Sequence, residues 1–215
     1  MSVEHCWHTS HRIPVALLVA SACLSSCHDS NDGGTTAPPG AADPLVLSTL
    51  VVRLDGVVAF GPFGESLGGT RQSPAWTIIT SNPLDSVFAA APGIVEEILV
   101  NDPARPDREL HVRGTRSQYK QIYDHVEGVV VSKGSIVAAG TYLGHLGAYA
   151  GGRGWVELQI NDEHHYPPTF TDLASALAVC PLQFGTATFN AAHQAAYDRA
   201  PLHPGGLCLV STVVP

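Results

Sequence analysis

The stretch that decides the fold is Val131-Ser-Lys-Gly-Ser-Ile-Val-Ala-Ala-Gly-Thr-Tyr-Leu-Gly144, in which glycines at 134, 140 and 144 separate short apolar runs. β-Branched and aromatic residues favour strands, and glycine supplies the positive φ that tight turns require. The earlier segment Val87-Phe-Ala-Ala-Ala-Pro-Gly-Ile-Val95 has the same character. Both segments predict short strands joined by tight turns.

Similar runs occur on both sides of these segments, and glycine or proline separates nearly all of them. After about residue 170 the pattern changes, because residues 173–179 and 189–199 are rich in alanine and predict short helices or irregular structure. The sequence therefore predicts an all-β barrel or sandwich with a short, mixed and partly helical C-terminal tail. The predicted strands are residues 45–54, 76–80, 87–90, 93–100, 109–113, 121–125, 128–131, 140–146 and 154–160.

The N-terminus has the features of a bacterial lipoprotein signal. Residues 13–26 are mainly apolar but fall short of the roughly 20 residues that span a bilayer. They end in Leu24-Ser-Ser-Cys27, which resembles a lipobox, so we expect residues 1–26 to be removed and Cys27 to be lipidated. Cys23 is a second candidate, and an ordinary signal peptide is the alternative. His28 favours an outer membrane location facing the periplasm over inner-membrane retention.

Residues 27–44 are polar and rich in glycine and proline, which predicts a flexible tether. A domain over residues 45–165 and an extension over residues 166–215 follow it. Cys180 and Cys208 remain after processing, and in an oxidising compartment they are expected to form a disulfide; two buried thiols are the alternative. The net charge of −8, with 11 scattered basic residues, excludes a phosphate-binding patch and so argues against nucleic-acid binding.

Several motifs, in the same order and at compatible spacing, resemble the LytM/lysostaphin-type peptidases that cleave peptidoglycan. Residues 87–95 and 131–144 resemble that family's V-x-A-x-x-x-G-x-V and V-x-x-G-x-x-V-x-x-G-x-x-[IL]-G segments. Tyr123-Asp-His125 resembles its Y-x-H motif, and residues 154–160 stand where the family has an H-x-H-F-E strand. Phe63-Gly64 resembles the opening F-G. The resemblance implies a LytM-like barrel-sandwich domain of the duplicated hybrid type.

Most residues that such an enzyme needs are missing. The family's catalytic zinc has three protein ligands and a water, taken from an H-x-x-x-D pair and the second His of H-x-H. The first pair falls on Pro74 and Ile78, and H-x-H falls on Trp155 and Glu157. His125 alone is retained, as a vestigial candidate for the family's assisting histidine. The resemblance therefore implies a pseudoenzyme that needs no cofactor.

Two interpretations remain open for the residues of the expected groove. His125, Glu157, Tyr123 and Trp155 could line a binding groove, whereas Tyr123 and Trp155 could instead be packing residues. Glu157, His164 and His165 are weak metal candidates, which could form a rearranged site with His125 and Asp162 or belong to an ordinary polar loop.

The sequence predicts a non-catalytic cell-envelope lipoprotein, anchored to the membrane by its lipid, which binds peptidoglycan or an envelope protein. The first alternative is a divergent zinc metalloendopeptidase that acts on peptidoglycan peptides. The second is a structural or carrier-like barrel, because biotinyl and lipoyl domains have similar glycine spacing. Lys133 lies in Val-Ser-Lys-Gly rather than in a Met-Lys-Met-like carrier turn, which argues against the carrier.

Overall fold

The computed structural model describes residues 44–163 and 178–213. The chain divides into two compact units, residues 1–37 and residues 38–215, and only residues of the second unit are described. The predicted signal peptide, the lipidation site Cys27 and nearly all of the tether lie outside the described residues, as do His164 and His165. No helix in the described ranges is both long enough and apolar enough to cross a membrane.

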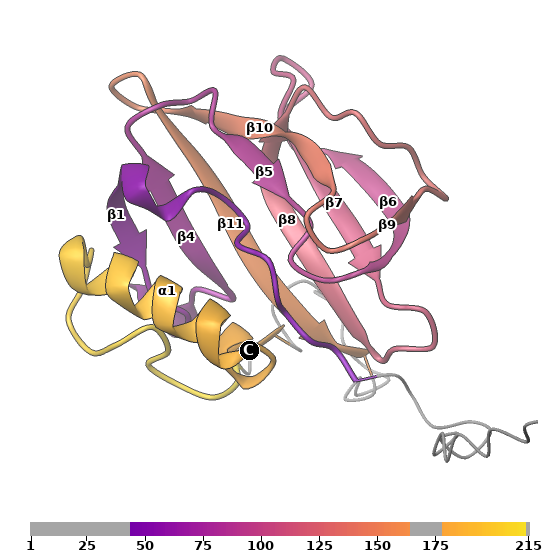
Figure 1. The fold of residues 1–215 in the computed structure, drawn as a ribbon. Coiled ribbons are helices and arrows are strands. Elements are labelled where there is room, and N and C mark those ends of the chain that lie inside the picture. Colours follow the sequence, from indigo (N-terminus) through magenta and orange to yellow (C-terminus); the bar gives the residue numbers. More distant parts are fainter. Residues whose placement is uncertain (1–43, 164–177, 214–215) are drawn as a thin grey trace, which may run out of the picture. The chain divides into compact units, whose positions relative to one another are not determined.

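One large antiparallel sheet forms the framework (Figure 1). Strand β5 (Ser86–Phe88) pairs with β10, β12 (Ala178–Val179) pairs with β11, and β2 (Ser66–Gly68) and β3 (Arg71–Gln72) form a separate hairpin. The order across the large sheet is β1 (Val57–Gly61), β4 (Ala75–Thr80), β11 (Arg153–Asp162), β10 (Tyr142–Tyr149), β8 (Tyr119–Glu127), β7 (Arg108–Arg113), β6 (Gly93–Val100) and β9 (Ile136–Val137).

The long strand β11 organises the sheet because it pairs with three main strands. One edge pairs with β4 from Gly154 to Gln159. The other edge pairs first with β10, where Gly147 lies opposite Trp155, and then with β8, where Glu157 lies opposite Asp124. Two strands thus share one edge of β11, and β8 and β10 also pair with each other.

Side chains alternate between the two faces of a strand, and this alternation gives the sheet a core face and an open face. On the core face, Trp76, Tyr123 and Leu158 are fully buried and belong to the main hydrophobic cluster. Their strand neighbours Thr77, Asp124 and Glu157 point to the other side and are only partly buried. We call this second side the open face.

The C-terminal helix α1 (Ala187–Arg199) packs on the core face, in front of β1 and β4 in Figure 1. It begins where the Thr186 hydroxyl accepts a hydrogen bond from the Phe189 N–H, a standard N-cap. The Trp76 ring of β4 stacks on Phe189 and His193 of the helix, with centroid distances of 6.2 and 5.0 Å. The helix therefore lies on the side of the sheet opposite Glu157.

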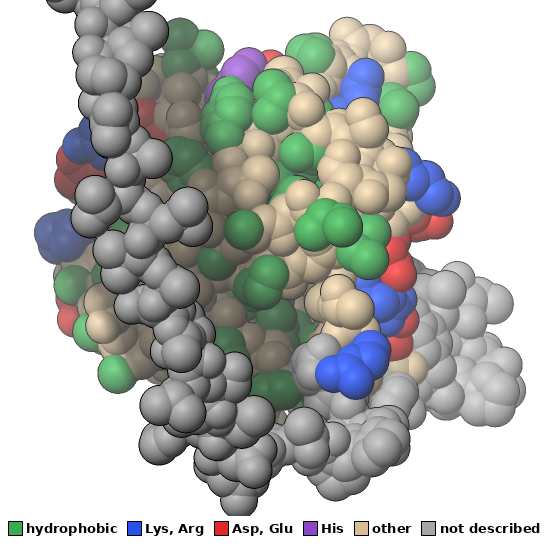
Figure 2. All heavy atoms as spheres, turned by 45° about the vertical axis from the view of Figure 1, so that its right-hand side comes forward, with side chains coloured by type: hydrophobic (Ala, Val, Ile, Leu, Met, Phe, Trp, Pro, Cys, Tyr) green, Lys and Arg blue, Asp and Glu red, His purple; other side chains and the backbone are tan. Residues whose placement is uncertain are grey.

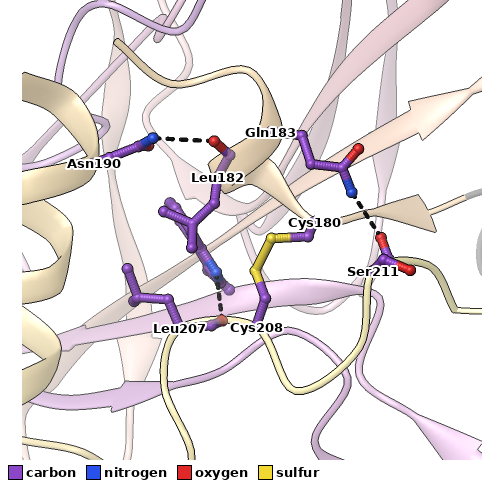
Figure 3. The surroundings of a disulfide bond; sticks show 8 residues. Cys180, Leu182, Gln183, Asn190, Leu207, Cys208 and Ser211 are labelled. Atoms are coloured by element: carbon purple, nitrogen blue, oxygen red, sulfur yellow. Dashed lines mark hydrogen bonds between the residues drawn. A yellow bond between two sulfur atoms is a disulfide. The ribbon is translucent and has the colours of Figure 1, made fainter. Parts of the chain in front are cut away.

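A disulfide joins Cys180 to Cys208 and holds the segment after α1 beside β12 (Figure 3). Hydrogen bonds around it link the same pieces, since Gln183 donates to the Ser211 carbonyl and the Trp76 indole donates to the Leu207 carbonyl. The short 3-10 turn Pro181–Gln183 follows Cys180 directly. The described part of the extension is thus fixed to the core-face side of the sheet.

The predicted fold class is confirmed, because the domain is mostly β-sheet with one C-terminal helix. The helix predicted at residues 189–199 is present, starting at Ala187, whereas Ala178–Val179 form β12 instead of a helix. The strand predicted at residues 45–54 is wrong. That segment is irregular, buries Leu47 and Val51, and bonds to isolated backbone groups rather than to one neighbouring strand. Residues 128–131 also form no strand.

The glycines of the decisive stretch have two different roles. Gly134 and Gly140 adopt φ of 89° and 83° in turns, as predicted. Gly144 lies inside β10, where a Cβ atom would come within 2.6 Å of the Glu127 carbonyl oxygen. Close strand approach, and not turn formation, requires glycine at 144.

Candidate functional site

A row of polar side chains crosses the open face of the sheet. Glu157 of β11 lies opposite Thr77 of β4 on one side and Asp124 of β8 on the other. The Thr77 hydroxyl donates to the Glu157 carboxylate at 2.9 Å. Burial raises the pKa of Glu157 above its usual value, and the charges of Asp124 and Glu109 act in the same direction, whereas the Thr77 hydrogen bond and His125 oppose the shift. The row is thus acidic and partly shielded from water.

His125 lies at the end of this row, where neighbouring groups contact both its backbone and its ring. Its backbone has a φ of 60°, in the left-handed region, and its N–H donates to the Asp124 side chain at 2.7 Å. Its ring stacks on Trp155, with centroids 3.4 Å apart and planes 18° from parallel. Its Nδ1 lies 2.9 Å from Asp107 Oδ2, and Gly147 packs against its main chain. The imidazole is therefore oriented by an aromatic face and by a carboxylate.

Asp107 and Asp124 approach the two nitrogens of the His125 ring. Asp107 contacts Nδ1, and Asp124 Oδ2 lies 3.6 Å from Nε2. The Asn101 side-chain amide donates to both carboxylates and so joins the β6–β7 loop to β8. Burial raises the pKa of Asp124, and the charge of Glu109 adds to this, whereas His125 and the hydrogen bonds lower it.

One set of three metal-ligating groups exists in the described part of the chain, formed by Asp107, Asp124 and His125. Their ligand atoms all lie within 4.8 Å of one another. Sequence reasoning missed both aspartates. Asp124 adjoins His125 in the Tyr-Asp-His motif, which offered a local signal, but Asp107 is 18 residues away and reaches His125 only through the pairing of β7 with β8.

The residues at the resembled family's zinc positions do not fit zinc. Ile78 is fully buried on the core face, and the open-face residue beside it is Thr77, a neutral hydroxyl. Pro74 has no donor group. Trp155, an indole, stands at the position of the assisting histidine that opens H-x-H, which is not a zinc ligand. Glu157 alone could ligate a metal, and it accepts a hydrogen bond from Thr77 instead.

Of the four groove residues predicted from sequence, the structure places three on the open face and the fourth, Tyr123, on the core face. His125, Trp155 and Glu157 all lie on the open face. Tyr123 is a correction, because its side chain points to the core face and is fully buried. Its hydroxyl accepts a hydrogen bond from the Ala90 N–H and donates to Gln121, and burial raises its pKa far above the usual value. Tyr123 is a packing residue.

The structure describes only some residues of the rearranged metal site that was predicted near the end of β11. Asp162 is buried at the end of that strand, where the Gln118 amide donates to it at 3.2 Å. It is not part of the described group of three ligands around His125. His164 and His165 lie outside the described residues.

No protein-family model matches the sequence, and no curated protein matches it. Among solved structures, the chain is similar to Helicobacter pylori Csd3, with a TM-score of 0.48 and 16% identity over 67% of this chain and 34% of that one. The antimicrobial peptidase lysostaphin from Staphylococcus simulans gives a TM-score of 0.47 and 16% identity, over 71% of this chain and 56% of that one. A chain of the SpoIIQ–SpoIIIAH pore-forming complex gives a TM-score of 0.47 and 16% identity, over 66% and 92%.

This chain thus spans less than two thirds of the Csd3 and lysostaphin chains. The similar structures include lysostaphin, which represents the peptidases that the sequence motifs resemble, and also a pore-forming complex. At these TM-scores and identities, the similarities carry no argument about activity, ligand or partner.

Proposed function

We propose that this chain is a non-catalytic cell-envelope lipoprotein whose peptidase-like domain binds a cell-wall or protein partner. The observation that carries the proposal is the state of the two H-x-H positions. Trp155 stacks on the retained His125, and Glu157 accepts a hydrogen bond from Thr77. A catalytic zinc needs three protein ligands and an open position for water. At the three ligand positions, Pro74 and Ile78 offer no donor group and Glu157 offers a single carboxylate.

Two surfaces support a binding role. The open face carries the polar row, and the described C-terminal helix packs on the opposite face. At the other end of the sheet, a hollow of about 460 Å³ has an apolar lining that includes Leu45, Pro92 and Val137. Ile136 beside it is 85% exposed, and Figure 2 shows hydrophobic side chains spread over this side of the molecule. Exposed apolar surface next to a hollow suits contact with a protein partner.

The lipobox at Cys27 supports export, lipid anchoring and a location at the outer membrane facing the periplasm. A protein tethered there by residues 27–44 would reach the cell wall. Cys27→Ala is expected to abolish labelling with a radioactive fatty acid and to release the protein from the membrane fraction. Lipid labelling that persists in Cys27→Ala and disappears in Cys23→Ala would move the anchor to Cys23.

The central experiment incubates the purified chain with intact peptidoglycan and measures two quantities, the protein that sediments with the wall and the soluble fragments released. We expect sedimentation without fragment release, even with added zinc. If a partner protein is the ligand instead, the chain stays in solution and cross-linking in cells yields a defined adduct on the open face or at the apolar hollow. The absence of both binding results contradicts the proposal.

The alternative function, a divergent zinc metalloendopeptidase, draws support from the Asp107, Asp124 and His125 group. It predicts zinc-dependent release of peptide fragments that is lost in His125→Ala. The same incubation decides between the two functions, because a pseudoenzyme releases no fragments at any zinc concentration.

A further inference from the structure

We propose that Asp107, Asp124 and His125 form a binding site for a first-row divalent transition-metal ion, separate from the family's zinc positions. The donor set has two carboxylates and one imidazole from two places: Asp107 of the β6–β7 loop, and the adjacent residues Asp124 and His125 of β8, where His125 has a φ of 60°. Glu157, the residue at a family zinc position, is not part of this set. The inference does not depend on the proposed binding function.

The distances place the three groups within reach of one ion. Zinc and similar ions bind carboxylate oxygen and imidazole nitrogen at about 2.0–2.2 Å, so neighbouring ligand atoms lie about 3–3.5 Å apart. Asp107 Oδ2 lies 2.9 Å from His125 Nδ1, and Asp124 Oδ2 lies 3.6 Å from Nε2. The two carboxylates thus stand at different nitrogens of the ring, and an ion takes only one of these nitrogens, so the other carboxylate has to rotate toward it. The ligand atoms of all three residues lie within 4.8 Å of one another, which keeps this movement local. The side chains are already largely withdrawn from solvent, with exposed fractions of 13%, 25% and 17% for Asp107, Asp124 and His125.

A second observation is the unbalanced negative charge of this end of the open face. In the described ranges, neither Lys nor Arg forms an ion pair with Asp107, Asp124, Glu109 or Glu157, and only histidines pair with the first three. The nearby Arg108 guanidinium donates to the backbone carbonyls of Arg105 and Asp107 instead. Partly buried carboxylates are costly unless a cation or a proton compensates them.

The opposite end of the same face shows how this protein compensates carboxylates where no ion is needed. There Lys120 lies between Glu96 and Glu163, at 3.4 and 2.8 Å. Arg113 contacts the same two glutamates. One face thus has two acidic clusters: Lys120 and Arg113 pair with one, and within residues 44–163 and 178–213 no Lys or Arg forms an ion pair with the other. A bound cation would give the second cluster the balance that the first already has.

The ligand types identify the class of ion. Calcium prefers six to eight oxygen ligands and magnesium prefers octahedral oxygen with several waters, whereas imidazole with carboxylates suits zinc, manganese(II) or iron(II). A bound ion would tie the β6–β7 loop to β8.

The test uses the untagged full chain in detergent, stripped with a chelator and titrated with zinc, manganese(II) and calcium by calorimetry at pH 7.5. Elemental analysis then gives the stoichiometry. We expect about one zinc or manganese per chain and at least about 10-fold weaker binding in Asp107→Asn and in Asp124→Asn. Asp102→Asn is the matched control, since Asp102 lies in the same loop but has a side chain that is 46% exposed and pairs with Arg105. It should bind like the original chain.

Three results would overturn the proposal: no binding up to 1 mM ion (about the weakest affinity that calorimetry resolves), equal affinity for calcium, or binding that Asp107→Asn and Asp124→Asn leave intact. Binding lost only in Glu157→Gln would place the metal at the family position and contradict the proposed non-catalytic function as well. The melting temperature of each metal-free variant reports whether it is folded. If Asp124→Asn fails to fold, Asp107→Asn alone decides, because the Asp107 loop lies outside the hydrophobic core.

Discussion

The two faces of the sheet use the same strands and opposite chemistry. On β4, β8 and β11, the core face presents Trp76, Tyr123 and Leu158, and the adjacent residues Thr77, Asp124 and Glu157 form the open face. One face is stabilised by aromatic packing against α1, and the other carries carboxylates that lack Lys or Arg partners in the described residues. Neighbouring residues of one strand therefore have different roles: one packs in the core and stabilises the fold, and the next contributes to the candidate site.

The faces should also respond oppositely to acid. Burial lowers the pKa of His193, on the core face, to about 4, with its hydrogen bond to the Phe189 carbonyl acting the other way. Burial raises the pKa of Glu157 on the open face. Folding thus disfavours the protonation of His193 and favours that of Glu157. As the pH falls, His193 should lower the stability of the folded chain, whereas Glu157 should raise it.

The largest expected effect comes from the core face. Trp76→Ala removes a fully buried ring that stacks on Phe189 and His193, and it should lower the free energy of unfolding by about 3–5 kcal/mol. Thr77→Val, one residue away on the open face, should change it by less than about 1 kcal/mol. Urea denaturation measures both. Equal losses would mean that the two faces are not distinct in stability.

The disulfide between Cys180 and Cys208 is expected to rank next. It closes a loop with a sequence separation of 28 residues, for which the chain-entropy model gives about 3–4 kcal/mol. The Cys180→Ser, Cys208→Ser double variant should melt well below the oxidised chain, and reducing agent should lower the melting point of the original chain only. Because the bond anchors the core-face side, metal affinity at the open face should stay unchanged. A coupled loss of affinity would contradict the separation of the faces.

His193 should make stability fall in acid. Its ring is fully buried among Phe60, Trp76 and Phe189, and its Nε2 has no hydrogen-bond partner in the described residues. His193 binds a proton near pH 6.5 in the unfolded chain and only near pH 4 in the folded chain. The free energy of unfolding should therefore decrease as the pH falls from 6.5 to 4. The full loss is about 3 kcal/mol at 1.36 kcal/mol per pKa unit.

Urea denaturation at a series of pH values measures this slope. His193→Leu should flatten it, whatever the variant does to stability at neutral pH. A slope that His193→Leu leaves unchanged would assign the acid sensitivity to other groups.

The smallest effect is expected at Glu157. Glu157→Gln removes a desolvated charge and keeps an oxygen that can accept from Thr77, so stability at pH 7 should rise by about 1 kcal/mol or less. In the original chain, the raised pKa of Glu157 makes the folded state gain stability as the pH falls through it. The variant should lack this gain, which a comparison of the two pH profiles measures. A clear destabilisation at pH 7 would mean that the carboxylate has a charged partner.

The resemblance of residues 87–95 and 131–144 to the peptidase family predicted the fold class, because glycine spacing and alternating apolar residues are local properties of a sequence. The strand at Gly93–Val100 was predicted from its β-branched run, and the C-terminal helix from the alanine content of residues 189–199. The wrong strand at residues 45–54 has a different cause. Its apolar residues are buried by packing under the sheet without a neighbouring strand, and composition cannot distinguish these two forms of burial.

Sequence by itself determined that the resembled family's zinc ligands are missing, since Pro74, Ile78 and Glu157 occupy their places whatever the fold. Only the tertiary structure decided which residues lie together at the candidate site. The side of the sheet that Tyr123 faces depends on the register of β8, and the position of α1 depends on aromatic packing. Asp107 meets His125 only because β7 pairs with β8. Contacts between residues far apart in the chain arise from strand pairing and burial, and no local pattern records them.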